Sequence, residues 1–167
     1  AADWLALANA VPAAKSAAIW ERLEKMSGFP EPFTRNDLRA RTRWSERRRE
    51  LVLKEDLRDL SGVRSLAQVE ELALLLQERT ASTLSLNSLR EDLAVSFDTV
   101  KHWVELLERL YFCFRVPPFT GSLSRSLTKE KKLYLWDWAD VEESGARFEG
   151  MVASHLLKAV DAWNDLG

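Results

Sequence analysis

A run of arginines between residues 35 and 49 is the strongest candidate for binding chemistry. The segment RNDLRARTRWSERRR holds seven arginines against two acids, a local excess of five positive charges. A guanidinium grips phosphate oxygens through two parallel hydrogen bonds, so the run suits a nucleic-acid backbone or a nucleotide. The alternative is a solvated helix whose arginines pair with Glu50, Glu55 and Asp56. The candidate contacts are Arg39, Arg43, Arg47, Arg48 and Arg49.

Residues 89–110, LREDLAVSFDTVKHWVELLERL, have the pattern of a helix-turn-helix, whose second helix can enter a DNA groove. Over residues 82–119, however, four basic side chains stand against five acidic ones. Because phosphate attraction supplies most non-specific DNA affinity, a net-negative unit is a poor DNA reader. The same scaffold also serves in protein docking, and both possibilities stay open. The candidate DNA contacts at the start of the second helix are Ser96, Thr99, Lys101 and His102.

No motif for catalysis or metal binding stands out. His102 and His155 lie on different segments, and neither has a second histidine or a cysteine at ligand spacing. The G-x-S-x-G turn that presents a nucleophilic serine does not occur. We therefore predict no catalytic residues and no metal site.

The overall composition describes an ordinary globular chain. Its formal charge of −2 excludes a polycation that coats nucleic acid with its whole surface, although local patches stay possible. The single cysteine, Cys113, excludes an internal disulfide and is expected to be buried among the aromatic residues of YFCFRV. No apolar run approaches the roughly 18 residues of a membrane helix, and no signal peptide is visible. We expect a cytoplasmic protein without membrane contact.

The elements that position these residues are predicted to be mainly α with a small β component. Pro12 and Gly28 bracket a helix over residues 13–26. The two prolines of GFPEPF then predict an extended turn. A long polar helix is expected from about residue 36 to 60. An amphipathic helix follows over residues 65–80.

A winged helix-turn-helix is predicted to follow this helical region. Residues 82–86 alternate and favour a short strand. Ser88 and Glu91 form a capping-box pattern that opens the first helix, and Ser96 can cap the second. The strands YFCFRV and KKLYLWD then complete the unit as a hairpin.

The last segment, GARFEGMVASHLLKAV, is predicted to form an amphipathic helix. Its expected buried face consists of Phe148, Val152, Leu156 and Val160, which recur at four-residue intervals. Leaving these side chains in water forfeits roughly 1.5–3 kcal/mol each. We therefore expect them to fold back onto KKLYLWD and the winged helix, or to pack against a second copy as a dimer caused by truncation.

Five segments resemble, in their order and spacing, the C-terminal half of a bacterial and archaeal family of AAA+ ATPases. They are MSGFPEPF, LVLKEDLRDL, VSFDTVKHWVELLERLYFCFRVPPF, KKLYLWD and GARFEGMVASHLL, and they are distributed over residues 26–157. In that family a P-loop ATPase module precedes a helical region, a winged helix and a domain similar to PD-(D/E)xK nucleases. The chain departs from the family at Glu55, where an arginine is usual, and in the short segment after Asp137.

The resemblance implies four regions, with boundaries at residues 1–33, 34–80, 81–136 and 137–167. They correspond to the end of the ATPase module with its connecting loop, a lid-like helical region, the winged helix and the start of a truncated nuclease-like domain. In nucleases of this type a strand aspartate and a helix glutamate bind magnesium. Asp137 and Glu149 take these two positions, but the later acid-x-lysine strand has no counterpart.

The resulting hypothesis is a non-catalytic winged-helix fragment that couples an ATPase module to a partner, either DNA or protein. The resemblance implies ATP and magnesium for the parent protein and no cofactor for this chain. A free-standing winged-helix transcription regulator is the first alternative. A fragment of a PD-(D/E)xK-like nuclease is the second.

The first testable prediction concerns nucleotide binding. The sequence lacks G-x-x-x-x-G-K-[ST], the loop whose amides and lysine hold a triphosphate. Titration of magnesium ATP into the chain should therefore give no saturable heat below about millimolar concentration. A micromolar isotherm by calorimetry would contradict this expectation.

Overall fold

The computed structural model describes residues 13–56, 66–121 and 129–165. These residues are mainly α-helical with one two-stranded antiparallel sheet, which confirms the predicted fold class. No helix in these ranges combines the length and hydrophobicity that a membrane span needs. In chain order the elements are α2 (Ala13–Met26), α3 (Pro30–Arg35), α4 (Leu38–Glu50), the π-helix η1 (Leu51–Asp56), α6 (Leu66–Glu78), α7 (Leu86–Asp92), α8 (Phe97–Arg109), β1 (Cys113–Val116), β2 (Lys132–Leu135), the short 3₁₀ helix η2 (Trp138–Asp140) and α10 (Ser144–Asp165).

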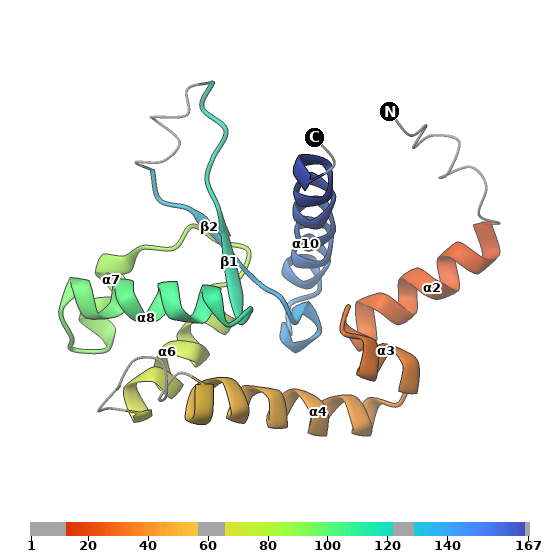
Figure 1. Cartoon of the computed structure of the whole chain (residues 1–167), viewed down its shortest axis with the longest axis horizontal. Helices are drawn as coiled ribbons and strands as arrows, with labels where there is room; N and C mark the ends of the chain where they lie inside the picture. Colours follow the sequence, from red (N-terminus) through yellow and green to blue (C-terminus); the bar gives the residue numbers. More distant parts are fainter. Residues whose placement is uncertain (1–12, 57–65, 122–128, 166–167) are drawn as a thin grey trace.

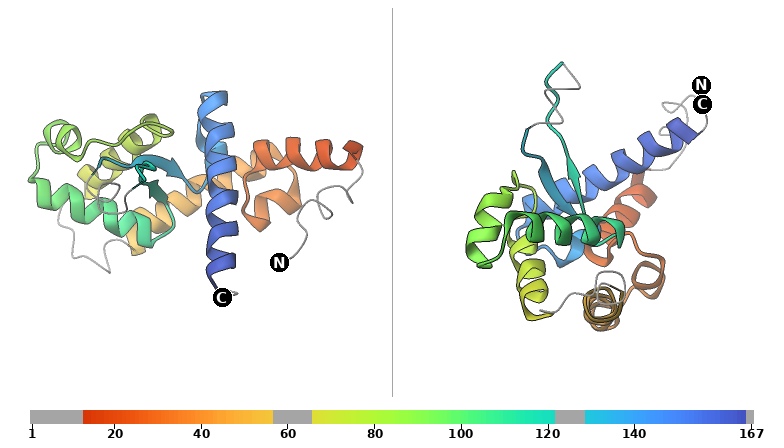
Figure 2. Two further views of the ribbon diagram at one scale, coloured as in Figure 1. Left: turned by 90° about the horizontal axis from the view of Figure 1, so that it is seen from above. Right: turned by 60° about the vertical axis from the view of Figure 1, so that its left-hand side comes forward.

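The elements form two groups with α10 between them. Figure 1 shows α4 along the bottom of the molecule, with α2 and α3 at one end and the helices α6 to α8 with the hairpin at the other. Viewed from above in Figure 2, α10 crosses the molecule between the hairpin and α2. In chain order β2 is followed by η2 and then by α10. The segment from β2 to η2 therefore connects the hairpin with the N-terminal group of helices.

The prolines of GFPEPF form the short helix α3, so the predicted extended turn is wrong. Pro30 occupies the first helical position, where its missing N–H removes no helical hydrogen bond. The preceding helix α2 confirms the prediction over residues 13–26 but ends differently. Ser27, and not Gly28, carries the positive φ of 72°, and its N–H donates to the Leu23 carbonyl at 3.0 Å.

α4 confirms most of the polar helix that was predicted from about residue 36 to 60. Asp37 caps it, because its carboxylate accepts a hydrogen bond from the Ala40 N–H at 2.6 Å. The helix then widens into η1, which places Val52 and Leu53 in the core. Residues 57–60 of the predicted helix lie outside the described residues.

The two helices and the hairpin predicted after residue 80 form as α7, α8, β1 and β2, while the winged helix-turn-helix itself stays a prediction. β1 and β2 pair antiparallel in a register that sets Cys113 opposite Leu135. The predicted strand at residues 82–86 shrinks to one bridge between Thr83 and Lys132, because α7 already begins at residue 86. The prediction of a strand there was therefore too long.

Only one of the two predicted helix caps forms in this unit. The Ser96 hydroxyl accepts a hydrogen bond from the Thr99 N–H at 3.1 Å and caps α8 as predicted. Ser88 instead lies inside α7, where its hydroxyl accepts a hydrogen bond from Arg79 at 3.3 Å. The predicted capping box of Ser88 with Glu91 is therefore wrong.

One hydrophobic core joins α6, α7, α8 and the hairpin. Cys113 is fully buried in it as predicted, and burial raises the pKa of its thiol, which stays neutral. The apolar faces that helical spacing predicted for α6 and α8 also point into this core. Its fully buried members include Val69, Leu72, Leu76, Leu89, Val100, Val104, Leu107 and Leu133.

Trp138 in η2 connects this core to the N-terminal helices. Its side chain is 1% exposed, and its indole N–H donates to the Leu23 carbonyl of α2 at 3.0 Å. Its ring also lies beside His155 of α10, with 5.4 Å between the ring centroids. The indole leaves no room at Gly28, where an added Cβ would come within 2.4 Å of the Trp138 Cη2 atom.

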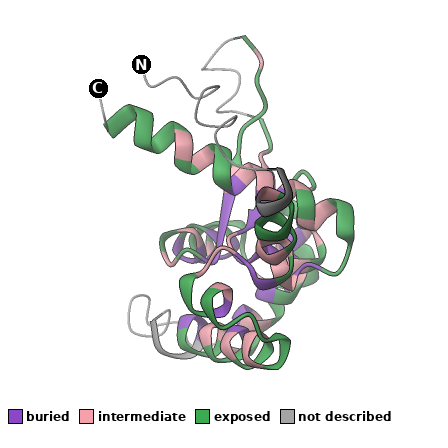
Figure 3. Cartoon of the chain, turned by 90° about the vertical axis from the view of Figure 1, so that its right-hand side faces the viewer, coloured by how far each residue is buried: buried purple, intermediate pink, exposed green. Residues whose placement is uncertain are grey.

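α10 buries a different face from the one that its sequence predicted. Phe148, Leu156 and Val160 are 47%, 62% and 46% exposed, and the helix half beyond them is exposed in Figure 3. The helix instead approaches η2 through small side chains, since Gly150 lies against the Trp138 Cβ. The buried positions are Gly150, Met151 and Ser154.

The expected folding of this apolar face back onto the hairpin is therefore wrong. Phe148 does make an edge contact with Trp20 of α2, with 5.9 Å between the ring centroids. Val152 is half-buried, whereas Leu156 and Val160 are exposed, and pairing of this face with a second copy stays a prediction.

The close approach at Trp138 predicts opposite effects for two neighbouring glycines. Gly28→Ala should lower the free energy of unfolding by about 1–3 kcal/mol, because the new methyl group overlaps the indole. Gly150→Ala should leave it unchanged or raise it by up to about 1 kcal/mol, because its Cβ meets Trp138 at an ordinary 3.6 Å and alanine favours a helix. Urea unfolding of both variants checks the pair, and equal losses would contradict the packing described here.

Candidate functional site

The strongest concentration of charge contacts lies between α4 and η2. The Asp140 carboxylate receives Arg41 at 2.5 Å on one oxygen and Arg49 at 3.3 Å on the other. The Ser45 hydroxyl donates to the same carboxylate. Arg41 and Asp140 are only 13% and 16% exposed, so this cluster is largely shielded from water. We call Arg41, Ser45, Arg49 and Asp140 the inner cluster.

Helical spacing explains why these residues meet. Positions 41, 45, 48 and 49 lie on one side of α4, since residues three and four apart share a face. Arg48 also points inward, where it donates to the Tyr111 carbonyl at 2.6 Å and covers the Phe29 ring at 4.5 Å. Arg48 and Arg49 were predicted to contact nucleic acid, but the structure commits both guanidinium groups to contacts within the chain. Their contact with nucleic acid stays a prediction, and these internal bonds leave fewer of their N–H groups for phosphate.

Asp137 lies next to the inner cluster without a hydrogen bond. Its carboxylate is buried, and neither oxygen has a hydrogen-bond partner among the described residues. Its nearest cation is Arg41, whose Nη2 is 3.8 Å from Oδ1. Burial raises the pKa of Asp137, and the neighbouring carboxylate of Asp140 raises it further. The nearby Ser27 hydroxyl, Arg41 and Arg48 only partly oppose this shift.

The outer side of α4 carries the remaining candidate arginines. Arg39, Arg43 and Arg47 are exposed and form no hydrogen bond or ion pair with the rest of the described chain. Because they are spaced by four residues, they follow one another along a single face over about 12 Å. We call these three residues the outer stripe. Glu46 and Glu50 share this face and reduce its net positive charge.

At the start of α8, fewer side chains are available for contact with DNA than the sequence predicted. The hydroxyls of Ser96 and Thr99 form a hydrogen bond with each other in the helix cap, with 2.7 Å between the oxygens. Lys101 and His102 are exposed, as a contact to DNA requires. Asp98 and Glu105 are exposed on the same helix, however, so its outer surface carries no excess of positive charge.

Asp137 and Glu149, the two carboxylates suggested by the nuclease resemblance, have separate surroundings. Asp137 faces the arginines of α4. Glu149 accepts a hydrogen bond from the Tyr134 hydroxyl at 2.6 Å and pairs with Lys132 at 2.5 Å. The two groups share no partner among the described residues, so the structure does not bring them together as a pair.

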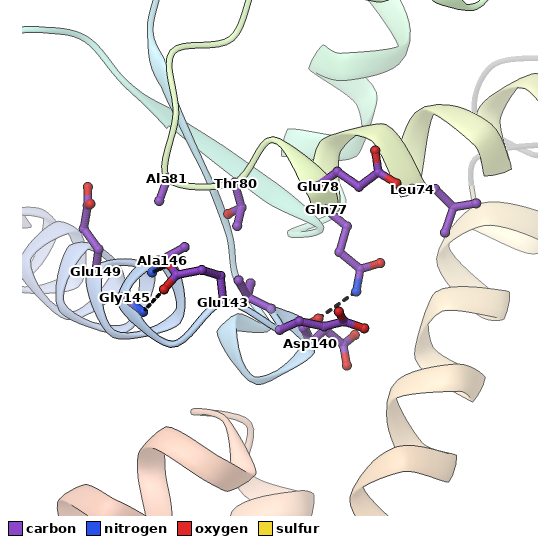
Figure 4. Close-up of a pocket in the computed structure, with 12 residues that line it drawn as sticks. Leu74, Gln77, Glu78, Thr80, Ala81, Asp140, Glu143, Gly145, Ala146 and Glu149 are labelled. Atoms are coloured by element: carbon purple, nitrogen blue, oxygen red, sulfur yellow. Dashed lines mark hydrogen bonds between the residues drawn. The ribbon is translucent and has the colours of Figure 1, made fainter.

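A cavity of about 850 Å³ lies between the end of α6 and the start of α10. Figure 4 shows Gln77 and Thr80 on one side of it and the segment from Asp140 to Glu149 on the other. Gln77 connects the two sides, since its amide donates to the Asp140 carbonyl at 2.8 Å. Sequence analysis missed this cavity, because its two walls are about 60 residues apart in the chain and carry no motif.

The comparisons with known proteins place the chain in a family. Residues 19–139, more than half of the chain, match the family model described as a domain of unknown function, DUF8612, and the chain belongs to this family. The matched region extends from α2 into η2 and leaves out α10. No curated protein and no solved structure matches the chain.

Removing the charge of Asp137, which precedes η2, and removing that of Asp140, which ends η2, should change the stability of the fold in opposite directions. Folding raises the pKa of Asp137, so ionising this group costs stability once the pH exceeds its ordinary value of 3.8. Asp137→Asn should therefore raise the free energy of unfolding at pH 7, because the amide carries no charge that burial removes from water. The gain should disappear as the pH falls below that ordinary value, where both states hold the proton.

Asp140→Asn is the matched variant. It leaves Arg41 and Arg49 without their carboxylate and should lower the free energy of unfolding by about 3–5 kcal/mol at pH 7. Urea unfolding of both variants at neutral and acidic pH measures the difference. Destabilisation by Asp137→Asn at pH 7, or a gain that does not change with pH, would refute the assigned roles.

Proposed function

We propose that this chain is a non-catalytic coupling module that holds the phosphate backbone of DNA through the outer stripe of α4. The observation that carries the proposal is the set of three exposed arginines, Arg39, Arg43 and Arg47, without partners among the described residues. The resemblance to the C-terminal half of AAA+ ATPases supplies the context, in which the module connects an ATPase to DNA. ATP and magnesium belong to that parent protein, and the cytoplasm is its place of action.

The position of the outer stripe suits contact with a phosphate backbone. It spans about 12 Å, and one DNA strand presents a phosphate about every 3.4 Å along the axis, so the stripe can follow about three phosphates. The inner cluster anchors α4 from behind through Arg41 and Arg49. A helix that is already fixed loses little conformational freedom on binding, which favours affinity.

The acidic side chains on the same face of α4 limit the expected affinity for DNA. Glu46 and Glu50 lie beside the stripe, so the attraction to phosphate is modest and binding should be weak and steeply dependent on salt. Phosphate contacts carry no sequence information, so the module should not distinguish one duplex sequence from another. A coupling role requires only sequence-independent binding of DNA.

The experiment compares two triple variants that remove equal charge. Arg39→Gln, Arg43→Gln and Arg47→Gln together should reduce the slope of log affinity against log salt by about 0.9 for each lost phosphate contact. The matched control changes Lys101, Arg109 and Lys129 to Gln, which removes three cations from the side of the helix-turn-helix. Fluorescence anisotropy with a short mixed-sequence duplex measures both slopes, and the control should keep the slope of the unchanged chain.

The reverse result favours the free-standing winged-helix regulator. In that case the control triple flattens the slope, the outer-stripe triple does not, and His102→Ala loses affinity for some duplex sequences only. An unchanged slope in the outer-stripe triple is sufficient to reject the proposed DNA contact.

A further inference from the structure

A second cavity, of about 530 Å³, lies beside the second half of α10. A volume of this size holds a small organic ligand or one large side chain. The lining outside α10 is mainly aromatic and comes from the residues before α3, the turn before β1 and the segment after β2. Tyr111 is 65% exposed and Trp136 is half-buried, so both rings present apolar surface to a ligand. The aromatic lining residues are Phe29, Tyr111, Trp136 and Trp138.

Cations of the chain itself already lie on two of these rings. The guanidinium of Arg48 is 4.5 Å from the centroid of the Phe29 ring, and the ammonium of Lys158 is 5.5 Å from that of Trp136. The face of an aromatic ring carries partial negative charge and attracts a cation, most often a guanidinium. Lys158 is exposed and has no ion pair among the described residues, so a stronger cation can replace its ammonium on the ring.

The helix α10 contributes two carboxylates to the same cavity. Asp161 and Asp165 are one helical turn apart and share a face with Lys158, since residues three and four apart are neighbours on a helix. Both are exposed, and neither has a hydrogen bond or ion pair within residues 13–56, 66–121 and 129–165. Ala162 beside them is small and leaves the space in front of the carboxylates open. This wall therefore carries net negative charge opposite aromatic rings.

We propose that this cavity binds the arginine side chain of a partner polypeptide, with the guanidinium on the Tyr111 and Trp136 rings and its N–H groups donated to Asp161 and Asp165. The occupant follows from charge complementarity, because the cavity combines cation-binding rings with carboxylates that lack partners. The site lies away from the outer stripe of α4, so it goes beyond the proposed DNA contact and does not depend on it.

The chemistry of the lining favours a guanidinium in a polypeptide over other cations. A guanidinium is planar, so it stacks on a ring and still donates N–H groups in its plane to carboxylates, as Arg48 does between Phe29 and the Tyr111 carbonyl. An ammonium is a compact, strongly hydrated charge that cannot stack. Free arginine carries its own carboxylate, which the two aspartates repel, whereas an arginine within a polypeptide does not.

The test titrates the tripeptide acetyl-Gly-Arg-Gly-amide into the whole ¹⁵N-labelled chain and follows the indole N–H signals by NMR. The signal of Trp136 should shift saturably, with a dissociation constant of about millimolar for one side chain. The same tripeptide with citrulline, which keeps the shape of arginine without its charge, should cause no saturable shift. The lysine tripeptide and free arginine should each bind at least about threefold more weakly.

Variants of the cavity separate its two kinds of contact. Asp161→Asn with Asp165→Asn should weaken binding of the arginine tripeptide by about tenfold, through the loss of two exposed charge pairs. Tyr111→Leu should weaken it by about threefold, because it removes a ring face from an exposed position. Tyr111→Phe keeps the ring and should bind as the unchanged chain does.

The position of Lys158 gives a further measurement with the opposite sign. Lys158→Met keeps the apolar stem but removes the cation that competes for the Trp136 ring, so affinity for the tripeptide should rise by about fivefold. Lys101→Met on α8 removes the same charge outside the cavity and should change affinity by less than about twofold.

The matched control for the acids changes Glu71 on α6 and Glu105 on α8 to Gln, which removes two negative charges outside the cavity. It should alter affinity by less than about twofold, and circular dichroism verifies that each variant keeps its helices. Absence of saturable binding to the unchanged chain, equal binding of the citrulline tripeptide, or equal weakening in this control overturns the proposal. Free arginine that binds as tightly as the tripeptide overturns the polypeptide as its source.

Discussion

Two arginines of α4 share one carboxylate, that of Asp140, and this largely buried contact holds the N-terminal helices against the rest of the chain. Three groups bond to the same carboxylate, from Arg41, Ser45 and Arg49. Removing charges from water is unfavourable, so such a cluster is stable only when each charge has its partners. The neighbouring Asp137 lacks hydrogen bonds and illustrates the opposite case. The position of α4 therefore depends on one side chain of η2, and Trp138 of the same short helix holds α2 through its indole N–H.

This arrangement divides the arginines of one helix into two groups with different physical roles. The inner guanidinium groups neutralise buried carboxylates and are not available to an external ligand. The outer ones meet only water and the acids beside them, which leaves their charge for a partner. A local excess of positive charge in the sequence thus overstates the charge that the folded surface presents. The same reasoning applies to α8, whose exposed acids and bases nearly cancel.

Features that depend on regular spacing could be predicted from the sequence, and features that depend on a distant contact could not. The helices α2, α6 and α8 and the hairpin were predicted because their apolar residues recur with the period of a helix or strand. The face of α10 was mispredicted, because periodicity marks an apolar stripe without saying whether a partner covers it. Gly150 is buried instead, since a small residue lets the helix approach Trp138. Arg48 and Arg39 look equivalent in the sequence, and only the contacts of Arg48 with the Tyr111 carbonyl and the Phe29 ring separate their roles. The cavity at Thr80 had no signal at all, because its walls meet only in the fold.

The separation of these contacts along the chain has a consequence for synthesis. Arg41 and its carboxylate on Asp140 are 99 residues apart, and the Leu23 carbonyl and the Trp138 indole are 115 apart. A ribosome adding roughly 5–20 residues per second needs about 5–20 s to make the intervening segment. During that interval α2 and α4 exist without the groups that bury their inner face, and the nascent chain presents all seven arginines of residues 35–49 to its surroundings. The helices α2 and α4 are therefore made before the groups on η2 that they dock against, and until then Arg41 and Arg49 lack their carboxylate.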